Sequence, residues 1–455
     1  MRFMVFAAAA LVSPAPVLSQ NMSARVDSVM REAESRGFSG VVQIIRDGAL
    51  VLEKGYGMAN RAQRIPFSPR TVVQIGSNTK DFTKVAILQL MEKGQLRLSD
   101  PLSKHFPSAP ADKRDITIRQ LMNHRAGFPI GLGADVAQVN RQQLIEAAMN
   151  FKLLFNPGER ANYSNTGYAL LAAIVEQVSG KSYDEYVRDN ILSPLGLSDT
   201  GFHLPAFDTT RLAHGYSAGG KDEGTLLARP RLPDGPYWNL RGNGGMLSTV
   251  LDMSAFYRAL FETDKLLGPT ARREDFPRNQ PVALAGSDLV NFFIYERDPG
   301  AKVEIIIASN NSEVKPPSIM PGVMAALGLV RGGVVRETSG PPLAQRTGKP
   351  ATPVQNEIAR DLVAAVNSGS SATISAFIRD RFSVGDVSAE ERLGRLTSVN
   401  ANLGTLEVLG VTVGDDGALQ VQLRSAKEGN ATLTVDIEPA PPHRIRRLGL
   451  MVGGG

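Results

Sequence analysis

Ser77 and Lys80 are the two residues whose types and spacing are best suited to chemistry. They lie in the sequence Ser-Asn-Thr-Lys, after an apolar extended run at residues 71–76 and before a helical pattern of apolar residues at 82–91. At the start of a helix, this spacing places a hydroxyl and an amine on one face, one turn apart. The amine can then hold or accept the hydroxyl proton, which makes the alcohol a nucleophile. The alternative for Ser77 is a helix N-cap, which only satisfies backbone N–H groups.

Tyr163 is the next candidate for chemistry, in the sequence Tyr163-Ser164-Asn165. A Pro-Gly turn at residues 157–158 precedes it, and an apolar helical pattern begins at about residue 168. A loop tip ahead of a helix is a position from which a phenol can face a cleft. The alternative is a half-buried tyrosine, with Asn165 capping the helix.

A third pattern, Gly215-Tyr-Ser217-Ala-Gly219, matches the G-x-S-x-G nucleophile elbow of α/β-hydrolases. That motif requires a strand before it and a helix after it. The flanking sequences, at residues 208–211 and 220–224, fit neither element. We therefore interpret Ser217 as part of a turn.

The composition limits the possible classes of function. With 455 residues, the chain is too long for one compact core and predicts two or more domains. A hydrophobic content of 42% with 21% charged residues is ordinary for a soluble globular protein. The net charge of +5 is small, and basic and acidic residues are interspersed without a Lys/Arg block, so nucleic-acid binding is not expected.

Cysteine and histidine usage argues against a metal centre. The chain has no cysteine, which excludes cysteine nucleophiles and thiolate ligands. Its five histidines are scattered, without an H-E-x-x-H motif or an i, i+4 pair: His105, His124, His203, His214 and His443. We expect no metal and no cofactor, and the expected partner is a small-molecule or peptide substrate.

Residues 1–19 have the pattern of a secretory signal. Arg2 supplies a positive start, and residues 3–12 form an apolar run that is too short to span a membrane. Small or modest residues at 17–19 place the expected cleavage near Ser19–Gln20. The chain is therefore expected to be exported to the periplasm or secreted, without stable membrane insertion after signal cleavage.

The elements that must position Ser77 and Tyr163 follow a simple order along the chain. A helix is expected at about 23–36, and then a hairpin at 40–55 with Asp47-Gly48 as its turn. Helices follow at 118–123, 141–149, 168–178 and 183–190, and then a buried strand at 303–309 and a helix at 319–327. Strands at both ends of a helical middle predict an α+β fold, in which the sheet is built from both ends of the segment and helices pack on it.

The chain is expected to divide into a first domain at 20–330, a Gly/Pro-rich linker at 331–353 and a second domain at 354–455. In the second domain, helices are expected at 354–367, 371–382 and 389–396, and strands at 405–413, 418–425, 431–438 and 444–451. Helices on an antiparallel meander make a small α+β domain that is similar to cystatin-like or NTF2-like folds. Nothing in it indicates catalysis, so we interpret it as an accessory domain.

Several ordered segments resemble the serine β-lactamase-like family, which contains class C β-lactamases, D-alanyl-D-alanine carboxypeptidases and related esterases. The resemblance covers roughly residues 25–330 and includes Gly37-Phe-Ser-Gly-Val-Val, residues 73–84 with Ser77 and Lys80, Leu96-Arg-Leu-Ser-Asp-Pro-Leu, residues 116–128, Tyr163-Ser-Asn and Gly244-Gly-Met-Leu-Ser-Thr. It implies a β-lactamase/transpeptidase-like antiparallel sheet flanked by helices, beside an all-helical lobe, with the site between them.

The resemblance also implies roles for the candidate residues. Ser77 would attack a carbonyl to form an acyl-enzyme, Lys80 and Tyr163 would share the general-base work, and Asn165 would contact the substrate or Lys80. A lysine with the ordinary pKa near 10.4 is protonated at pH 7, and lowering its pKa to about 7 costs about 4.6 kcal/mol. A close Lys–Tyr pair can instead hold one mobile proton. Water would then hydrolyse the acyl-enzyme.

The chain departs from the family in its third motif, which has His or Lys, then any residue, then Gly on a strand lining the site. The matching stretch here is residues 282–289, with Ala283 in the place of the His or Lys. Gly286 and Ser287 are the substrate-binding candidates on this strand. Losing one oxyanion-hole donor there would cost about 10²–10³ in rate.

These observations predict an exported serine hydrolase that cleaves an ester or amide, of the esterase, D-Ala peptidase or β-lactam class. The third motif contributes in the family to binding an acyl carboxylate, so its alteration favours an esterase or peptidase over an efficient β-lactamase. The alternative is a non-catalytic relative, a cell-wall or ligand-binding protein that keeps the fold and the cleft.

Overall fold

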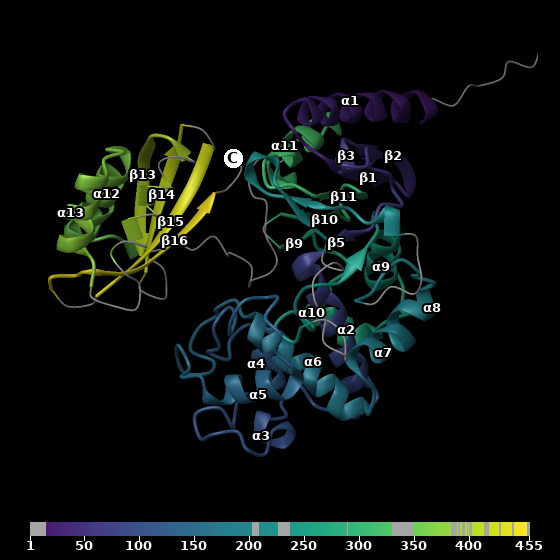
Figure 1. Cartoon of the computed structure of the whole chain (residues 1–455), viewed down its shortest axis with the longest axis horizontal. Coiled ribbons are helices and arrows are strands. Elements are labelled where there is room, and N and C mark those ends of the chain that lie inside the picture. Colours follow the sequence, from purple (N-terminus) through teal and green to yellow (C-terminus); the bar gives the residue numbers. More distant parts are fainter. Residues whose placement is uncertain are drawn as a thin grey trace, which may run out of the picture. The chain divides into compact units, whose positions relative to one another are not determined.

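The computed structural model describes residues 15–202, 209–225, 237–288, 290–329, 349–383, 389, 392–393, 396–397, 399, 403–413, 418–426, 429–438 and 441–452. Contacts divide the chain into two compact units, which are drawn in Figure 1. The first unit contains the described residues up to 329, and the second contains those from 349. Residues 331–348 of the predicted linker and residues 1–14 of the predicted signal lie outside the described residues.

The elements of the first unit follow the predicted order. They are α1 (Ala15–Ser35), β1 (Gly40–Arg46), β2 (Ala49–Tyr56), β3 (Met58–Asn60), β4 (Ile65–Pro66), β5 (Val73–Gln74), η1 (Gly76–Asn78), α2 (Thr79–Glu92), α3 (Leu102–His105), α4 (Ile118–Met122), α5 (Arg141–Asn150), α6 (Asn165–Ser179), α7 (Tyr183–Val187), η2 (Arg188–Leu192), α8 (Ser193–Leu195), η3 (Thr209–Arg211), β6 (Gly215–Tyr216), η4 (Ala218–Gly220), β7 (Asp222–Gly224), β8 (Leu247–Ser248), α9 (Val250–Glu262), α10 (Pro269–Asp275), β9 (Val282–Ser287), β10 (Phe292–Asp298), β11 (Val303–Ser309) and α11 (Pro316–Ala326). Helix α1 begins before its predicted start and runs through the predicted cleavage position. Within the described ranges, no helix has both the length and the apolarity to cross a membrane.

Five antiparallel strands form the main sheet, in the order β2-β1-β11-β10-β9. Strand β1 pairs with β11, with Gly40 opposite Ser309, so strands from the two ends of the unit lie side by side. This confirms the prediction of a sheet built from both ends. At the turn between β1 and β2, Asp47 and Gly48 have φ values of 52° and 77°, the left-handed pair that favours a two-residue hairpin.

Helices cover both faces of this sheet. On β11, Ile305 and Ile307 pack into a core with α1 and α11, whereas Ile306 and Ala308 pack into a larger core with α2 and α9. Alternate residues of a strand point to opposite faces, so each face receives every second side chain. Because both faces of the sheet are buried at β11, this strand has consecutive apolar residues and not an alternating pattern.

A helical region accompanies the sheet and carries the loop with Tyr163. Helix α2 is buried on most of its surface and packs against α6, which also packs against α4 and α5. In Figure 1, α3, α4, α5 and α6 gather apart from the strands. This region is the helical lobe that the resemblance implied. The turn η1, which precedes α2, contacts β9, so the sheet and the lobe meet at Ser77.

The second unit has a hydrophobic core of its own. Its elements are β12 (Lys349–Pro350), α12 (Pro353–Asn367), α13 (Ser371–Arg381), β13 (Leu406–Val413), β14 (Leu419–Ser425), β15 (Gly429–Ile437) and β16 (Ile445–Val452). Strands β12 to β16 form an antiparallel meander, and alternate residues of β14 are buried in a core with α12 and α13. The four predicted strands and the first two predicted helices are present, and half of the segment predicted as a helix at 389–396 lies outside the described residues. Strand β12, at the end of the predicted linker, pairs with β13 and so belongs to this sheet.

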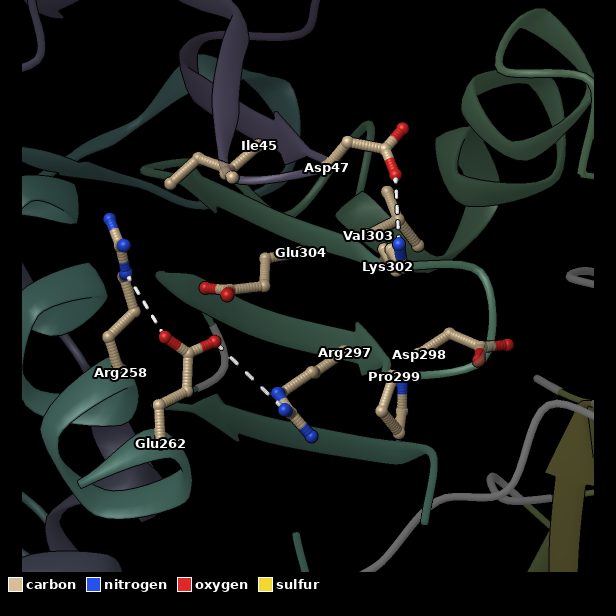
Figure 2. A pocket seen from close by; sticks show the side chains of 11 residues that line it. Ile45, Asp47, Arg258, Glu262, Arg297, Asp298, Pro299, Lys302, Val303 and Glu304 are labelled. Carbon is tan, nitrogen blue, oxygen red and sulfur yellow. Dashed lines mark ion pairs between the residues drawn. The ribbon is translucent and has the colours of Figure 1, made fainter. Parts of the chain in front are cut away.

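A cavity of about 240 Å³ lies at the end of the main sheet opposite to Gly286. Figure 2 shows Glu262 of α9 and Glu304 of β11 pointing into it. Arg258 and Arg297 approach Glu262 at 3.6 Å and 4.0 Å. None of the predicted site residues lines this cavity.

Candidate active site

Ser77 lies in the short turn η1, between β5 and α2. Gly76 precedes it with a φ of 50°, a left-handed value that glycine adopts without strain. The Oγ of Ser77 lies 2.6 Å from the Oη of Tyr163 and accepts a hydrogen bond of 3.1 Å from the Nζ of Lys80. The N-cap position of α2 is Asn78, and no side chain there accepts a helix N–H. The hydroxyl of Ser77 therefore contacts two reactive side chains and does not cap the helix.

Lys80 lies in the first turn of α2, with its side chain buried. Its Nζ also donates a hydrogen bond of 2.7 Å to the backbone carbonyl of Asn243. Burial lowers the pKa of Lys80 to about 7, and the carboxylates of Asp81 and Asp135 act in the opposite direction. Lys80 can therefore lose its proton near neutral pH, which a general base must do.

Tyr163 lies in the loop before α6, and the Nζ of Lys80 is 4.7 Å from the centroid of its ring. Burial raises the pKa of Tyr163 to about 12, although the hydrogen bond with Ser77 lowers it. The predicted sharing of one proton between Lys80 and Tyr163 stays a prediction. Burial disfavours the charged form of each group, so it lowers the pKa of a lysine and raises that of a tyrosine. Burial therefore favours the neutral form of both side chains near neutral pH.

Asn165 is the first residue of α6, and the helix is capped by its neighbour. The Oγ of Ser164 accepts the backbone N–H of Gly167. The backbone N–H of Asn165 donates to the carbonyl of Ile130, and its Oδ1 is buried without a hydrogen-bond partner among the described residues. No hydrogen bond joins the side chain of Asn165 to Lys80 in the part of the chain that the structure describes. The backbone carbonyl of Asn243 accepts the hydrogen bond from Lys80 instead. The only signal in the sequence for a role of Asn243 was that Gly244-Gly245 follows it.

Strand β9 packs directly against the turn that carries Ser77. A Cβ on Gly286 would lie 2.0 Å from the Ile75 carbonyl oxygen and 2.7 Å from the Ser77 backbone nitrogen, and a Cβ on Gly76 would lie 2.5 Å from the Ser287 nitrogen. Two glycines therefore permit this close approach of two backbones. Counted back from Gly286, the glycine at this contact, the first position of a His/Lys-x-Gly motif would be Leu284, which is the neighbour of the predicted Ala283. Both are apolar, so the departure from the family pattern remains.

A buried polar chain joins α2, β9 and α9 below Ser77. The Nδ2 of Asn78 donates to the Oη of Tyr257 at 2.7 Å and to the carbonyl of Leu284 at 3.4 Å. The Oη of Tyr257 donates to Asp81 at 2.9 Å. Burial raises the pKa of Asp81 to about 6, and Lys84, Tyr257 and Lys80 oppose this. The chain holds the N-terminus of α2 against β9 and places a carboxyl next to Lys80.

His124 is a residue of the site to which the sequence analysis assigned no role. Its ring centroid lies 4.5 Å from that of Tyr163, and its Nδ1 accepts the backbone N–H of Ser164 at 3.1 Å. The only signal in the sequence was its place in a segment that resembles the family.

Two other expectations concern Ser217 and metal binding. Ser217 lies between β6 and η4, and its Oγ donates to Glu223 at 2.8 Å. It therefore lies in a turn, as predicted, and not at a strand-to-helix elbow. Within the described residues, no cluster of three or more His, Asp or Glu side chains forms a set of metal ligands.

The chain matches a protein-family model described as Beta-lactamase over residues 19–289, a range that includes Ser77, Lys80, Tyr163 and Gly286. It is 34% identical to the putative penicillin-binding protein PbpX of Bacillus subtilis (strain 168) over 226 residues, which are 50% of this chain and 56% of PbpX. The matched stretch thus spans about half the length of this curated relative.

Two solved structures share the fold. The octameric penicillin-binding protein homologue from Pyrococcus abyssi has a TM-score of 0.58 and 23% identity, over 92% of this chain and 91% of that chain. The D-amino acid amidase from Ochrobactrum anthropi SV3, complexed with D-phenylalanine, has a TM-score of 0.55 and 22% identity, over 68% of this chain and 100% of that chain. These likenesses confirm the predicted fold class.

Proposed function

The chain belongs to the β-lactamase family, and from that premise we propose that it is a serine hydrolase that cleaves an ester or amide through an acyl-enzyme on Ser77. One observation carries the proposal. The Oγ of Ser77 lies within hydrogen-bond distance of both Lys80 Nζ and Tyr163 Oη. A nucleophile in contact with a lysine whose pKa is about 7 has the activating base that an alcohol needs.

In the proposed reaction, Ser77 Oγ attacks the substrate carbonyl while its proton passes to neutral Lys80. The new Oγ–carbon bond forms, and the bond to the leaving group breaks as that group takes up a proton. Tyr163, which is protonated at neutral pH, lies 2.6 Å from Ser77 Oγ and can supply the proton of the leaving group; the proton that Lys80 took from Ser77 then restores the phenol and leaves Lys80 neutral again. Water then hydrolyses the acyl-enzyme and regenerates Ser77.

Negative charge that develops on the carbonyl oxygen has favourable surroundings. Ser77 lies at the N-terminus of the 14-residue helix α2, whose dipole favours negative charge. The backbone of Gly286 and Ser287 lies against the Ser77 amide, so this strand is in position to act through its backbone although its motif is altered.

The charges around the site favour a substrate without an anionic acyl group. Strand β9, from Val282 to Ser287, contains no Lys, Arg or His. Asp135 lies in a loop whose Ala134 carbonyl accepts a hydrogen bond from Asn239. Burial raises the pKa of Asp135, the charge of Lys80 lowers it and the charge of Asp288 raises it. Two carboxyl groups and no cation on β9 favour a neutral ester or amide over a β-lactam carboxylate.

The location and the second unit complete the proposal. We propose export to the periplasm or secretion from the signal-like sequence at residues 1–19. The second unit, with its separate core, would be an accessory domain. The D-amino acid amidase fold match supports amides, beside esters, as substrates to test.

Covalent labelling tests the function. The purified protein is incubated with a fluorophosphonate probe and with a fluorescent penicillin, and Ser77→Ala and Ser217→Ala are treated in parallel. We expect a fluorophosphonate adduct that is lost in Ser77→Ala and kept in Ser217→Ala. If neither probe forms a Ser77-dependent adduct, the chain is the non-catalytic relative.

Competing substrates test the proposed preference. We expect a higher kcat/KM for p-nitrophenyl butyrate than for nitrocefin, which carries a carboxylate. Asp135→Asn removes one negative charge and should raise the nitrocefin value relative to the ester value, by about two- to tenfold for a partly solvated charge. An unchanged ratio would show that Asp135 does not influence substrate choice.

A further inference from the structure

Three contacts from His124 hold the Asn162-Tyr163-Ser164 segment, one contact for each residue. The backbone carbonyl of His124 accepts the N–H of Asn162 at 2.8 Å. Its ring lies 4.5 Å from the ring of Tyr163, with an angle of 30° between the planes. Its Nδ1 accepts the N–H of Ser164 at 3.1 Å. The backbone N–H groups on both sides of Tyr163 thus both donate to His124, which lies 39 positions before Tyr163 in the chain.

The backbone of His124 is itself unusual. Its φ is 56°, in the left-handed region that few residues other than glycine, asparagine, aspartate and histidine adopt. The residue follows Asn123, the C-cap of α4, and its N–H donates to the carbonyl of Leu121. This conformation turns the chain so that the carbonyl and the ring of His124 both face the Tyr163 loop. Tyr168 lies on the ring as well, at 5.1 Å between centroids.

The surroundings of His124 keep Nδ1 able to accept a hydrogen bond. Burial lowers the pKa of His124 to about 3, and the positive charges of Lys80 and Lys84 act in the same direction, whereas the hydrogen bond with Ser164 opposes them. A protonated ring would donate from both nitrogens and could not accept the Ser164 N–H. The geometry and the charge environment therefore agree on a neutral ring.

We infer that His124 is a positioning residue that holds the hydroxyl of Tyr163 within hydrogen-bond distance of Ser77. The effect of His124 on catalysis rests on the proposed function, but its effect on the distance between Tyr163 and Ser77 does not. Tyr163 reaches Ser77 from a loop, at 2.6 Å, and a loop needs outside contacts to hold such a distance. A misplacement of about 1 Å can cost about 100-fold in rate.

Two variants separate the acceptor from the backbone conformation. His124→Asn and His124→Gly both adopt left-handed φ readily, but only asparagine has a side-chain oxygen that can accept the Ser164 N–H. Thermal unfolding first establishes that each variant is folded. We expect kcat for p-nitrophenyl butyrate to stay within about fivefold of wild type in His124→Asn and to fall about 100-fold in His124→Gly, with KM little changed. Equal losses in the two folded variants would overturn the role of the acceptor.

A double-mutant cycle tests whether His124 acts through Tyr163. If it does, His124→Gly should have little further effect in a Tyr163→Phe background, because the hydroxyl being positioned is gone. A merely structural role would give the same fold-loss in both backgrounds, and that result would overturn the inference.

Crystal structures of the wild type and the two His124 variants provide a measurement that does not depend on activity. We expect the distance from Ser77 Oγ to Tyr163 Oη to be kept in His124→Asn and to grow by about 1 Å or more in His124→Gly. If the wild type proves unreactive, the proposed function fails, and this distance still decides the positioning role. An unchanged distance in His124→Gly would overturn that role.

Discussion

Lys80 illustrates how strongly the chemistry of one side chain depends on its surroundings. The Ser-x-x-Lys spacing alone places its amine near Ser77, but the amine of an ordinary lysine is protonated at neutral pH. Burial in the first turn of α2 lowers its pKa to about 7. The same burial raises the pKa of Tyr163 to about 12. One physical cause therefore favours the neutral form of both groups, which suits the roles of base and proton donor that we propose for them.

The pH dependence of the reaction should follow Lys80. Its proton must leave before it can accept that of Ser77, so kcat/KM should rise with pH around a midpoint near 7. The Asp81 carboxylate raises the pKa of Lys80, so Asp81→Asn should move the midpoint to lower pH. The measurement is kcat/KM for p-nitrophenyl butyrate from pH 5 to 9, with the Ser77→Ala background subtracted. A midpoint that stays or moves upward in Asp81→Asn would contradict this assignment.

At the scale of elements, β9 matters through its backbone more than through its side chains. Its motif lacks the family's His or Lys, yet Gly286 allows it to lie against Ser77. The altered side chains of β9 support the proposed change in substrate preference. The close approach that Gly286 permits keeps the backbone of β9 against Ser77.

Gly286→Ala should disrupt this contact. The added Cβ would lie 2.0 Å from a backbone oxygen, so β9 must move away from the nucleophile. We expect the fluorophosphonate labelling rate of Ser77 to fall by about 100-fold or more, as for the loss of an oxyanion-hole donor. Ala285→Ser, at the exposed neighbouring position, is the control and should label at nearly the wild-type rate. Normal labelling of Gly286→Ala would exclude β9 from the reaction.

Strand β11 carries a carboxyl group that should affect stability. Burial raises the pKa of Glu304 from its ordinary value of 4.5 to about 7, and Glu262 adds to this through a hydrogen bond and through its charge. Arg258 and Arg297 oppose the shift, and all four side chains line the cavity in Figure 2. Because the folded state binds the proton more tightly, the contribution of this group to stability is complete below pH 4.5 and is lost as the pH rises through about 7.

Glu304→Gln removes this titration and keeps a side-chain amide that can donate to Glu262. We expect the Tm of Glu304→Gln to fall less than the Tm of the wild type when the pH is raised from 5 to 8. Differential scanning calorimetry at the two values measures the change, and Glu407→Gln, on a different sheet in the second unit, is the control. A parallel loss of Tm in the wild type and Glu304→Gln would contradict the raised pKa.

At the scale of the whole molecule, the two units have separate cores. Leu419 is fully buried in the core of the second unit, among residues of α12, α13 and the meander. Residues of the first unit do not belong to this core within the described ranges. The units should therefore unfold as two cooperative transitions.

Leu419→Ala tests this independence. The cavity left by the side chain should destabilise the second unit by about 2–5 kcal/mol. We expect calorimetry to show one transition shifted down and the other unchanged, with the labelling rate of Ser77 as in the wild type. A shift of both transitions, or a single transition, would show that the units depend on each other.

Local patterns were sufficient to predict much of the first unit. The Asp47-Gly48 hairpin, the helix after Ser77 and the apolar strand at 303–309 follow from turn chemistry and periodicity within short windows. The one-turn separation of Ser77 and Lys80 is also local, because helix geometry decides it. Boundaries were less accurate, as with α1, which begins at Ala15 and not at about residue 23.

The sequence by itself thus determined the family, and it predicted the proposed nucleophile Ser77 and its partner Lys80, because these depend on residues close together in the chain or on ordered motifs. Only the tertiary structure decided what surrounds them. The contact of Lys80 with the Asn243 carbonyl joins residues 163 positions apart, and that of Ser77 with Tyr163 joins residues 86 apart. The approach of Gly286 to Ser77 and the contacts of His124 with the Tyr163 loop likewise result from tertiary packing. Burial, which separates the pKa values of Lys80 and Tyr163, exists only once the whole unit has folded.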